Sequence, residues 1–456
     1  MVTRTSKASD STPAFAPAQA RPALPPMAPG SRIAVVGGGV AGLGAAWLLS
    51  DKFSVTLYEA ENRVGGHTNT VDATVGGVTH PVDTGFLVHN DLTYPHLVQL
   101  FKHLEIPVHA SDMTFSVSLT QPDLEWAGTN LGTVFAQRRN LLRPAFLGML
   151  RDILRFNRHA AAYLARSGPH ALLGDLLDAE GYGQAMRDWY LLPMAGAIWS
   201  TPPSMVLAQP ARTFLSFCLN HRLLQVAGRP QWKTVKGGAR RYVDAMLPRI
   251  AQVRVASPVH TVKRLADGVE VRTAGHVDRF DAVVLATHAP TSLAMLDATD
   301  AEREVLSRVR YQPNEAVLHT DTALLPRRRS VWSAWNYLAG PTANAPMSVS
   351  YLLNVLQPLP FKQPVIVTLN PQREPAPDQV LGRYAYEHPI LDADAVEAQR
   401  RLPDIQGRAR VWFCGAWAGY GFHEDGLASA IRVAADFGVS PPWGDAHELH
   451  NLNGTT

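Results

Sequence analysis

The stretch IAVVGGGVAGLGAAWLL, residues 33–49, carries the strongest structural signal in the chain. Four apolar residues, Ile33–Val36, predict a buried strand, and the glycines after them predict a tight turn into a helix. Gly37, Gly39 and Gly42 form the pattern G-x-G-x-x-G. In this pattern the first glycine makes the turn, the second lets the backbone approach a pyrophosphate, and the third lets the helix pack on the strand.

A second predicted strand, Val55–Tyr58, ends in Glu59, which lies 22 residues after Gly37. At this spacing a carboxylate accepts hydrogen bonds from the ribose of an adenosine. The helix between the two strands would point its free N–H groups and the positive end of its dipole at the phosphates. Two strands, a helix and an acid frame the glycine turn, so we predict a dinucleotide-binding domain.

The residues after Glu59 indicate which dinucleotide is bound. Arg63, Gly65 and Gly66 complete the pattern E-x-x-x-R-x-G-G, which resembles the FAD-binding oxidoreductases that include the flavin amine oxidases, protoporphyrinogen oxidases and carotenoid desaturases. A guanidinium can neutralise phosphate charge, and glycines let the chain pass close to a flat ring. The resemblance implies FAD and an α/β fold, with a composite, discontinuous Rossmann-like FAD-binding domain and an interleaved α+β substrate domain.

Three further segments resemble the same flavoproteins. The segment HPVDTGFLVHNDLTYP, residues 80–95, would place the chain under the flavin, and FDAVVLATHAP, residues 280–290, resembles their second nucleotide-side strand. The segment Val411–Gly438 resembles their closing FAD motif: a strand at Val411–Phe413, an aromatic and glycine loop, and a helix from about Glu424 to Phe437. In that motif the helix N-terminus faces the flavin, where its dipole stabilises negative charge.

We therefore expect FAD to be bound, and bound non-covalently, because the segment that carries covalent flavin in some relatives is missing here. The residues expected to contact the cofactor are Gly37, Gly39, Val40, Ala41, Gly42, Glu59, Ala60, Arg63, Gly65, Gly66, His67, Asp83, Thr84, Gly85, Phe86, Val259, Gly415, Glu424, Asp425 and Gly426.

The chain of 456 residues suggests two interleaved domains, and 46% hydrophobic residues supply enough apolar surface to bury. We expect residues 96–230 to be mostly helical and residues 291–404 to be rich in strands. The expected organisation is a disordered tail over residues 1–30, an FAD-binding domain from residues 31–95, 231–290 and 405–440, a substrate domain from residues 96–230 and 291–404, and a C-terminal tail over residues 441–456.

Composition also excludes several classes of function. A net charge of +3 is too small to favour nucleic acid, and the 17 histidines show no ligand spacing typical of a metal centre. Only two cysteines occur, which fits a reducing compartment, and no apolar run reaches the length of a membrane span. We expect a cytoplasmic protein, with peripheral contact at the inner face of the membrane as an open alternative.

The sequence indicates the catalytic residues less clearly than the cofactor-binding motifs. Flavin amine oxidases use a lysine near the flavin, and the corresponding stretch, Pro313–His319, has none. Oxidation of a carbon–carbon bond needs only a dry pocket, alignment with flavin N5 and at most one base. The candidates for that base are His67, His423 and Tyr420, because they stand beside the flavin motifs. Either histidine has the alternative role of a packing or capping side chain, and Glu424 that of a helix N-terminal acid.

The substrate is expected to be a lipid. The segments VDTGFLVHNDLTYP, FAQRRNLLRPAFLGMLRDILRFNR and GYGFHEDGLASA resemble a bacterial subgroup of amine-oxidase-like, predicted NAD/FAD-binding proteins. Members are often encoded beside methyltransferases of the cyclopropane-fatty-acid synthase type, which implies lipid chemistry. We expect hydride transfer from an acyl chain to flavin N5; amine oxidation and a non-catalytic flavin-binding role remain alternatives. The arginine-rich segment Arg138–Arg158 predicts an amphipathic helix that contacts an anionic membrane, or one that packs on the core.

Overall fold

The apolar run before the glycine turn forms the central strand of a five-stranded parallel sheet. The computed structural model describes residues 27–200, 202–225, 228–339 and 348–444. In order across the sheet the strands are β10 (Gln252–Arg254), β2 (Ser54–Tyr58), β1 (Arg32–Val36), β14 (Ala282–Leu285) and β20 (Val411–Phe413). The expected strands at residues 33–36, 55–58, 280–290 and 411–413 are thus confirmed, as is the α/β fold class.

Alternate residues of β1 pack into two separate hydrophobic cores, as expected for a parallel sheet that is covered on both faces. Ile33 and Val35 pack with α1 (Val40–Leu49) and α15 (His423–Asp436), whereas Ala34 and Val36 pack toward the opposite face. That second face is covered by an antiparallel sheet and three helices: β11 (Val259–Arg264), β12 (Val269–Thr273), β13 (Val277–Phe280), α11 (Ala289–Met295), α12 (Asp300–Leu306) and α14 (Ala393–Ile405).

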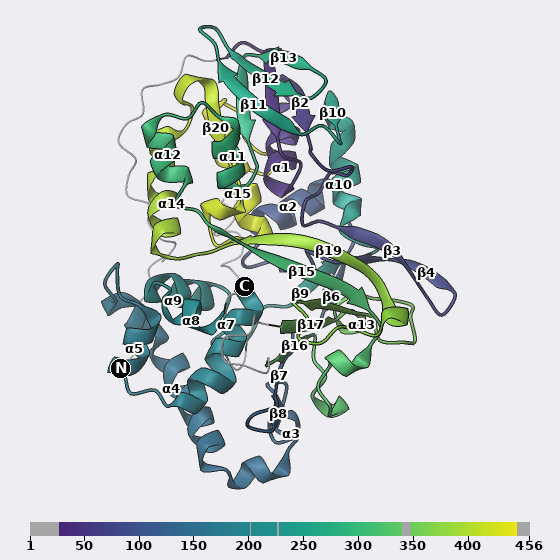
Figure 1. Cartoon of the computed structure of the whole chain (residues 1–456), viewed down its shortest axis with the longest axis vertical. Helices are drawn as coiled ribbons and strands as arrows, with labels where there is room; N and C mark the ends of the chain where they lie inside the picture. Colours follow the sequence, from purple (N-terminus) through teal and green to yellow (C-terminus); the bar gives the residue numbers. More distant parts are fainter. Residues whose placement is uncertain (1–26, 201, 226–227, 340–347, 445–456) are drawn as a thin grey trace, which may run out of the picture.

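The other half of the molecule is built on a seven-stranded mixed sheet. Its order is β19 (Val380–Pro389), β15 (Tyr311–His319), β18 (Ile366–Leu369), β17 (Ser348–Leu352), β16 (Trp335–Leu338), β7 (Phe115–Leu119) and β8 (Leu124–Ala127). The long strands β15 and β19 pair from Tyr311 opposite Pro389 to His319 opposite Val380. In Figure 1 these two strands cross the middle of the molecule, between the five-stranded sheet above and the rest of the mixed sheet below.

Smaller elements connect the two halves. A hairpin is formed by β3 (Thr70–Val75) and β4 (Val78–Asp83), and a three-stranded sheet by β5 (His89–Asn90), β9 (Trp232–Val235) and β6 (Val108–Ser111). The short helices beside them are α2 (Pro95–His103), α10 (Arg240–Met246) and α13 (Leu353–Leu356).

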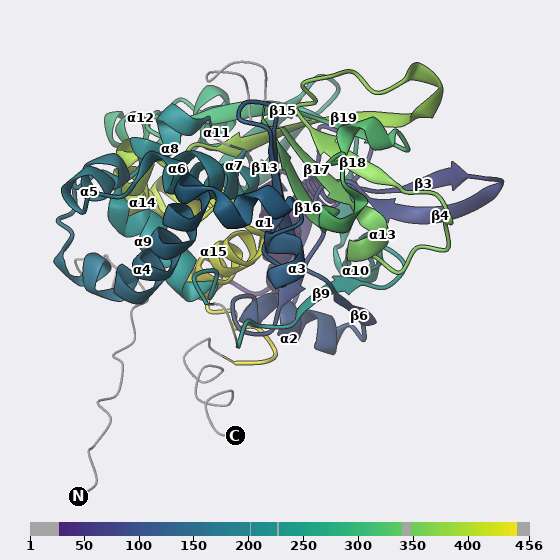
Figure 2. The same ribbon diagram turned by 90° about the horizontal axis from the view of Figure 1, so that it is seen from below.

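A helical lobe stands beside the mixed sheet, on the side away from the β3–β4 hairpin (Figure 2). Its helices are α3 (Leu131–Val134), α4 (Pro144–Arg166), α5 (Leu173–Ala179), α6 (Gln184–Met186), α7 (Leu192–Trp199), α8 (Pro203–Leu207) and α9 (Ala211–Asn220). Among the described residues, no helix combines the length and the apolar character that crossing a membrane requires.

The expectation of a mostly helical segment over residues 96–230 was wrong at its beginning. Strands β6, β7 and β8 all lie in this segment, and the last two belong to the mixed sheet. The alternation Phe-Ser-Val-Ser-Leu over Phe115–Leu119 is a strand pattern with buried apolar positions. The boundary drawn between residues 95 and 96 also falls inside α2. With these adjustments, the division into two interleaved domains stays a proposal.

Order extends further toward both ends than the sequence suggested. Met27 packs against the core and the N–H of Gly30 donates to the carbonyl of Lys52 at 2.7 Å, so the tail expected over residues 1–30 is too long. At the other end, Trp443 stacks on Trp47 with ring centroids 6.2 Å apart, inside the tail expected over residues 441–456. The remainder of the two expected tails, residues 1–26 and 445–456, lies outside the described residues.

Two glycine-to-alanine changes in helices should shift stability in opposite directions. A Cβ on Gly42 would lie 1.8 Å from the Gly37 oxygen, whereas one on Gly148, in α4, would meet nothing within 4 Å. We expect G42A to lower the free energy of unfolding by about 3 kcal/mol through overpacking. G148A should raise it by about 0.5–1 kcal/mol through helix propensity. Urea denaturation of the two variants measures both effects, and shifts of the same sign would contradict the packing described for α1.

Candidate active site

The three glycines of the first motif play three different parts. Gly37 has a φ of +103°, and a Cβ there would lie 2.9 Å from the oxygen of Ala286 on the neighbouring strand connection. Gly42 lets α1 approach the turn itself, as the sequence predicted. Around Gly39, by contrast, a Cβ would find no heavy atom within 4 Å. The space beside Gly39, where the sequence motif predicts a pyrophosphate, is therefore open.

The N-terminus of α1 faces the same space. Gly39 is its N-cap, no side chain caps it, and its first turn contains no acidic residue. The first N–H groups of a helix lack partners within the helix, and they bind anions readily. Val40 and Ala41 contribute two of these groups. The arrangement fits a phosphate-bearing cofactor, because no side chain of the described residues caps this helix end.

Glu59 ties the glycine turn to the end of β2. Its carboxylate accepts the N–H of Gly38 at 2.6 Å and the N–H of Glu61 at 2.8 Å. A carboxylate has further lone pairs, so hydroxyl donors of a ribose can still bind to it. The N–H of Ser257 donates to the Glu59 carbonyl at 2.9 Å, and this bond brings Val259, two residues onward, to the same edge of the sheet.

The second glycine motif touches the first. The N–H of Gly65 donates to the carbonyl of Gly38 at 2.8 Å, and a Cβ on Gly66 would lie 3.1 Å from the Cα of Gly39. Arg63 donates to the carbonyl of Thr68 at 3.4 Å, and no carboxylate of the described residues pairs with its guanidinium. A continuous backbone surface with one uncompensated cation thus runs from the helix N-terminus to this turn, which fits FAD.

The segment Asp83–Phe86 supports this turn from behind through protein contacts. A Cβ on Gly85 would lie 2.2 Å from the His67 oxygen, and the N–H of Phe86 donates to that oxygen at 2.8 Å. Thr84 donates to the Asn69 carbonyl at 3.0 Å. Direct contact of this segment with the cofactor stays a proposal.

The carboxylate of Asp83 has partners within the protein, and its expected contact with the cofactor stays a prediction. Its carboxylate accepts hydrogen bonds from Thr70, from the Ala239 N–H at 2.9 Å and from Gln357 at 2.6 Å. Burial raises its pKa to about 6, although these hydrogen bonds favour the charged form. The carboxylate thus joins β4 to α10.

Three acidic and glycine positions of the third motif also have contacts within the protein, and their expected cofactor contacts stay predictions. Both oxygens of Glu424 accept N–H groups at the start of α2, from His96 at 2.9 Å and Leu97 at 3.0 Å. Asp425 accepts the N–H of Phe422 at 2.9 Å and so caps its own helix. A Cβ on Gly426 would lie 2.7 Å from the Val40 side chain, so this glycine lets α15 pack against α1.

Gly415, the remaining position of that motif, lies between β20 and the aromatic loop. A Cβ there would lie 2.4 Å from the indole nitrogen of Trp417, and its N–H donates to the Ser429 hydroxyl at 2.9 Å. The indole nitrogen of Trp417 is buried and has no hydrogen-bond partner among the described residues.

His423 and Tyr420, two of the three expected bases, pack against aromatic rings in this structure. His423 opens α15, stacks on Phe86 with ring centroids 3.8 Å apart, and its Nε2 lies 2.9 Å from the Thr68 hydroxyl. Burial lowers its pKa to about 3. Burial also raises the pKa of Tyr420 to about 12, and its ring contacts Phe217 of α9 at 5.6 Å. His423 thus fits the packing alternative, and a catalytic role of either side chain stays a prediction.

His67 is the expected base that the structure leaves available. It directly follows the glycine pair, and its Nε2 is buried without a hydrogen-bond partner among the described residues. Its ring stacks on Tyr386 at 4.9 Å and faces His388 at 5.3 Å. Both partners come from β19, which crosses from the mixed sheet to the cofactor turn (Figure 1).

His388 is a site residue that the sequence reasoning missed. The stretch YAYEHP over Tyr384–Pro389 places Tyr384, Tyr386 and His388 at every second position, so they share one face of a strand. This alternation was the available signal. Nothing in it, however, indicated that the face is turned toward His67, which lies 321 residues earlier.

The site is electrostatically positive or neutral. Burial lowers the pKa of His67 well below its usual value, and repulsion by Arg63, and by His388, His423 and His288 when these are protonated, lowers it further. Burial lowers the pKa of His388 to about 4, with a smaller contribution from His288. The closest carboxylate on β19, Glu387, is paired with His288 at 2.9 Å. Near neutral pH both site histidines are therefore uncharged.

Comparison with known proteins agrees with this geometry. Residues 40–330 match the family model for flavin-containing amine oxidoreductases. A carotenoid phi-ring synthase from Streptomyces griseus is 27% identical over 278 residues, which are 56% of this chain and 52% of that protein. The match to this curated relative thus spans about half of its length.

Two solved structures share the fold. A CLA-producing fatty acid isomerase from P. acnes is 15% identical with a TM-score of 0.65, over 90% of this chain and 99% of that one. A cyclohexylamine oxidase from Brevibacterium oxydans IH-35A is 14% identical with a TM-score of 0.63, over 93% and 100% of the two chains. At this level of identity the likeness concerns the fold alone.

Replacing Glu59 should weaken binding of the cofactor. E59A removes the carboxylate that holds the Gly38 N–H and that we expect to bind the ribose. The loss of charge-assisted hydrogen bonds is worth about 1.5–3 kcal/mol, or roughly a ten- to hundredfold rise in Kd for FAD. E61A is the matched control, because Glu61 is exposed and contributes only its backbone N–H to Glu59. Flavin fluorescence titration measures both, and equal affinities would refute the ribose assignment.

A second variant tests the packing role of His423. Its folded-state pKa of about 3 lies below the usual 6.5, so the neutral ring adds stability that is present above about pH 6.5 and is lost as the pH falls toward 3. Between about pH 7.5 and 5.5 the wild type should lose roughly 1–1.5 kcal/mol more free energy of unfolding than H423Q. H109Q, at an exposed position on β6, should keep the wild-type dependence. Urea titrations at both pH values decide, and an unchanged slope in H423Q would count against a buried neutral ring.

Proposed function

The chain belongs to the family of flavin-containing amine oxidoreductases, with FAD as its cofactor, and from this premise we propose that it dehydrogenates an apolar acyl-lipid substrate. Bound flavin supplies a hydride acceptor at N5. The protein's own task is then to hold a carbon–hydrogen bond in a dry site beside the Gly65–Gly66 turn and to accept one proton. Amine oxidation is the second candidate.

The charge around His67 is the observation that carries the proposal. An amine substrate arrives as a cation, and a site that binds it needs a carboxylate or an aromatic cage. Of the groups that act on His67, only the Arg63 guanidinium is charged near neutral pH, because burial keeps His388, His423 and His288 neutral. Tyr386 and Asn314, which adjoin the two site histidines, are neutral. Such surroundings favour an uncharged substrate over an ammonium ion.

His67 is proposed as the base. Its imidazole is neutral, and its Nε2 is free to accept a proton because no described group binds it. The base would take a proton from one carbon of the bond under oxidation and the other carbon would lose a hydride to the flavin, so that a carbon–carbon double bond forms. The aromatic ring of Tyr386, stacked at 4.9 Å, fixes the plane of the imidazole.

His388 is proposed as a positioning residue whose tautomer is set by Asn314. The amide nitrogen of Asn314 donates to the Gln312 carbonyl at 3.0 Å, and its oxygen accepts from Asn370 at 2.8 Å. The same nitrogen lies 3.2 Å from Nδ1 of His388 and donates to it. Neutral His388 therefore carries its proton on Nε2, where it can orient a neighbouring group.

The names of two similar proteins are compatible with an apolar substrate. The curated relative is a carotenoid phi-ring synthase, and one structural neighbour is a fatty acid isomerase. Both names refer to long hydrocarbon substrates. The family description and the cyclohexylamine oxidase neighbour keep amine oxidation as the second candidate. A non-catalytic, redox-sensing or partner-binding flavoprotein is a third, and it would reduce its flavin with neither substrate class.

Anaerobic reduction of the bound flavin distinguishes these three functions. We expect a phospholipid with saturated acyl chains, presented in micelles, to bleach the visible flavin absorbance, and cyclohexylamine to leave it unchanged. The rate should be constant from about pH 6.5 to 8, because the lowered pKa of His67 keeps it neutral throughout this range. Reduction by the amine alone would establish the second candidate, and reduction by neither compound would refute the proposed dehydrogenase.

Substitution of the two site histidines tests their roles in the same assay. H67N should slow flavin reduction by about 10²–10⁴-fold, as expected for loss of a general base. H388N should slow it less and should change the pH profile, whereas H109N, on the exposed strand β6, should behave as the wild type. Flavin content, read from the visible spectrum, must stay constant across the series. An H67N variant with wild-type reduction rates would exclude His67 as the base.

A further inference from the structure

A cluster of exposed leucines lies at the end of the molecule opposite the five-stranded sheet. Nine large apolar side chains are exposed in the described part of the chain, and five of them lie between residues 131 and 154: Leu131, Leu141, Leu142, Leu147 and Leu154. Leu142 is 88% exposed. They belong to α3, to the 3₁₀ helix η1 (Arg138–Leu142) and to the first half of α4, at the lower end of Figure 1. Such concentration of exposed apolar side chains marks an interaction surface.

Helix α4 carries two apolar rows, where the sequence suggested one. The core row is fully buried and contains Phe146, Met149, Phe156, Ala160 and Tyr163. A helix turns by about 100° per residue, so the positions 147, 151, 154 and 158 share the opposite face. These positions hold Leu147, Arg151, Leu154 and Arg158, and the two leucines are 42% and 56% exposed. The second row therefore has no partner in the chain as described.

Positive charge accompanies this outward row. From Leu131 to Arg166 the sequence has seven arginines and one acid, Asp152. Asp152 is buried, and its carboxylate accepts the Gly183 N–H at 3.1 Å. The Arg151 side chain is 79% exposed, although it reaches Asp152 at 3.2 Å. Arg138 and Arg158 form no ion pair with any described residue, so their charge is directed at solvent.

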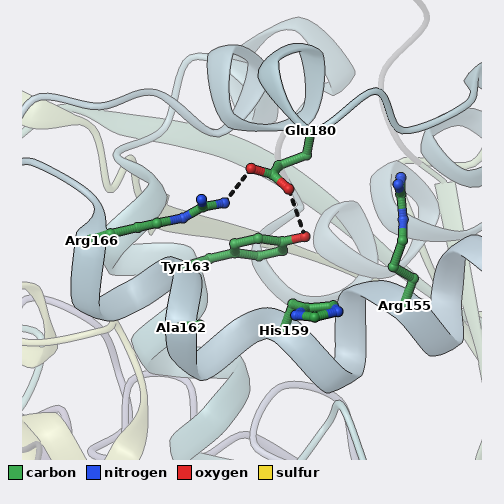
Figure 3. A pocket seen from close by; sticks show the side chains of 6 residues that line it. All are labelled: Arg155, His159, Ala162, Tyr163, Arg166 and Glu180. Atoms are coloured by element: carbon green, nitrogen blue, oxygen red, sulfur yellow. Dashed lines mark hydrogen bonds and ion pairs between the residues drawn. The ribbon is translucent and has the colours of Figure 1, made fainter.

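The arginines on the flank of α4 have a different role. Arg155 lies over the Tyr182 ring at 4.0 Å and donates to the Gly181 carbonyl at 3.4 Å. Arg166 and Tyr163 hold the Glu180 carboxylate, across a hollow of about 210 Å³ (Figure 3). These contacts fix α4 against its neighbours. The charges that remain for an outside partner are those of Arg138, Arg151 and Arg158.

We propose that η1 and the outward row of α4 dock on an anionic lipid bilayer. Leucines bury between the acyl chains and the headgroups, and arginines extend along that apolar surface to reach the phosphates. The alternation of the two residue types along one helix face matches such an interface, whereas a protein core has no use for unpaired arginines. The docking is inferred from these exposed leucines and arginines and does not depend on the proposed enzymatic function. If both hold, docking would bring the active site to an acyl substrate in the membrane.

Sedimentation with vesicles tests the wild-type protein loaded with FAD. We expect at least tenfold stronger binding to vesicles of phosphatidylglycerol and phosphatidylcholine than to phosphatidylcholine alone at low salt. The preference should vanish as salt rises, because the attraction is screened over about a Debye length. No turnover is needed, so failure of the proposed dehydrogenation would leave this measurement intact. Wild-type protein that ignores the anionic vesicles at low salt overturns the proposal.

Two triple variants separate the apolar from the basic contribution. L142S/L147S/L154S and R138Q/R151Q/R158Q should each lower vesicle binding at least tenfold while the melting temperature and flavin content stay unchanged. The matched controls, V78S/V255S/V277S and R279Q/R303Q/R408Q, change other exposed side chains outside this surface and should bind as the wild type. Equal loss in variants and controls overturns the proposal. A third outcome also overturns the proposal: neither the wild type nor the leucine variant binds vesicles, and the wild type is a dimer that the leucine variant dissociates. The surface would then bind a second copy of the chain.

Discussion

The contact between α1 and the turn that precedes it is the constraint on which the rest of the structure depends. Only a residue without a Cβ allows the helix to approach the Gly37 oxygen at Gly42. This approach sets the direction of α1, and α15 then packs across α1 where Gly426 meets Val40. The third motif is therefore positioned by the first, through the packing of α15 on α1.

The site itself is completed from the other half of the molecule. The glycine turns provide backbone and a helix N-terminus, which suit a cofactor but perform no chemistry on a substrate. Strands β15 and β19 add side chains to this half, because His388 faces His67 and Asn314 in turn binds His388. The consequence is a buried group of neutral imidazoles near a single cation, Arg63. A protein with the same cofactor-binding half but other residues on these two strands would present different side chains to the substrate.

The strand–turn–helix units could be predicted because glycine spacing and apolar runs act locally. The roles of acids could not be predicted. Asp83, Glu424 and Asp425 stand inside cofactor motifs, yet their carboxylates bind N–H groups of the protein, and a sequence does not show which donor lies opposite a carboxylate. The pairing of His67 with His388 was missed for a similar reason, since it depends on the path of a whole strand. The outward row of α4 could not be predicted, because the sequence does not show whether a leucine on a helix faces the core or the solvent.

The position of β14 bears on how the protein is made. Strand β1 pairs on one side with β2, which follows closely in the sequence, but on the other side with β14, where Ile33 lies opposite Ala282. During synthesis this second edge has no partner until some 249 further residues have emerged, and an open, apolar edge strand invites pairing with other chains. Helix α15, which covers α1, arrives later still. The most apolar segment of the growing chain is therefore open to pairing with other chains until β14 has been made.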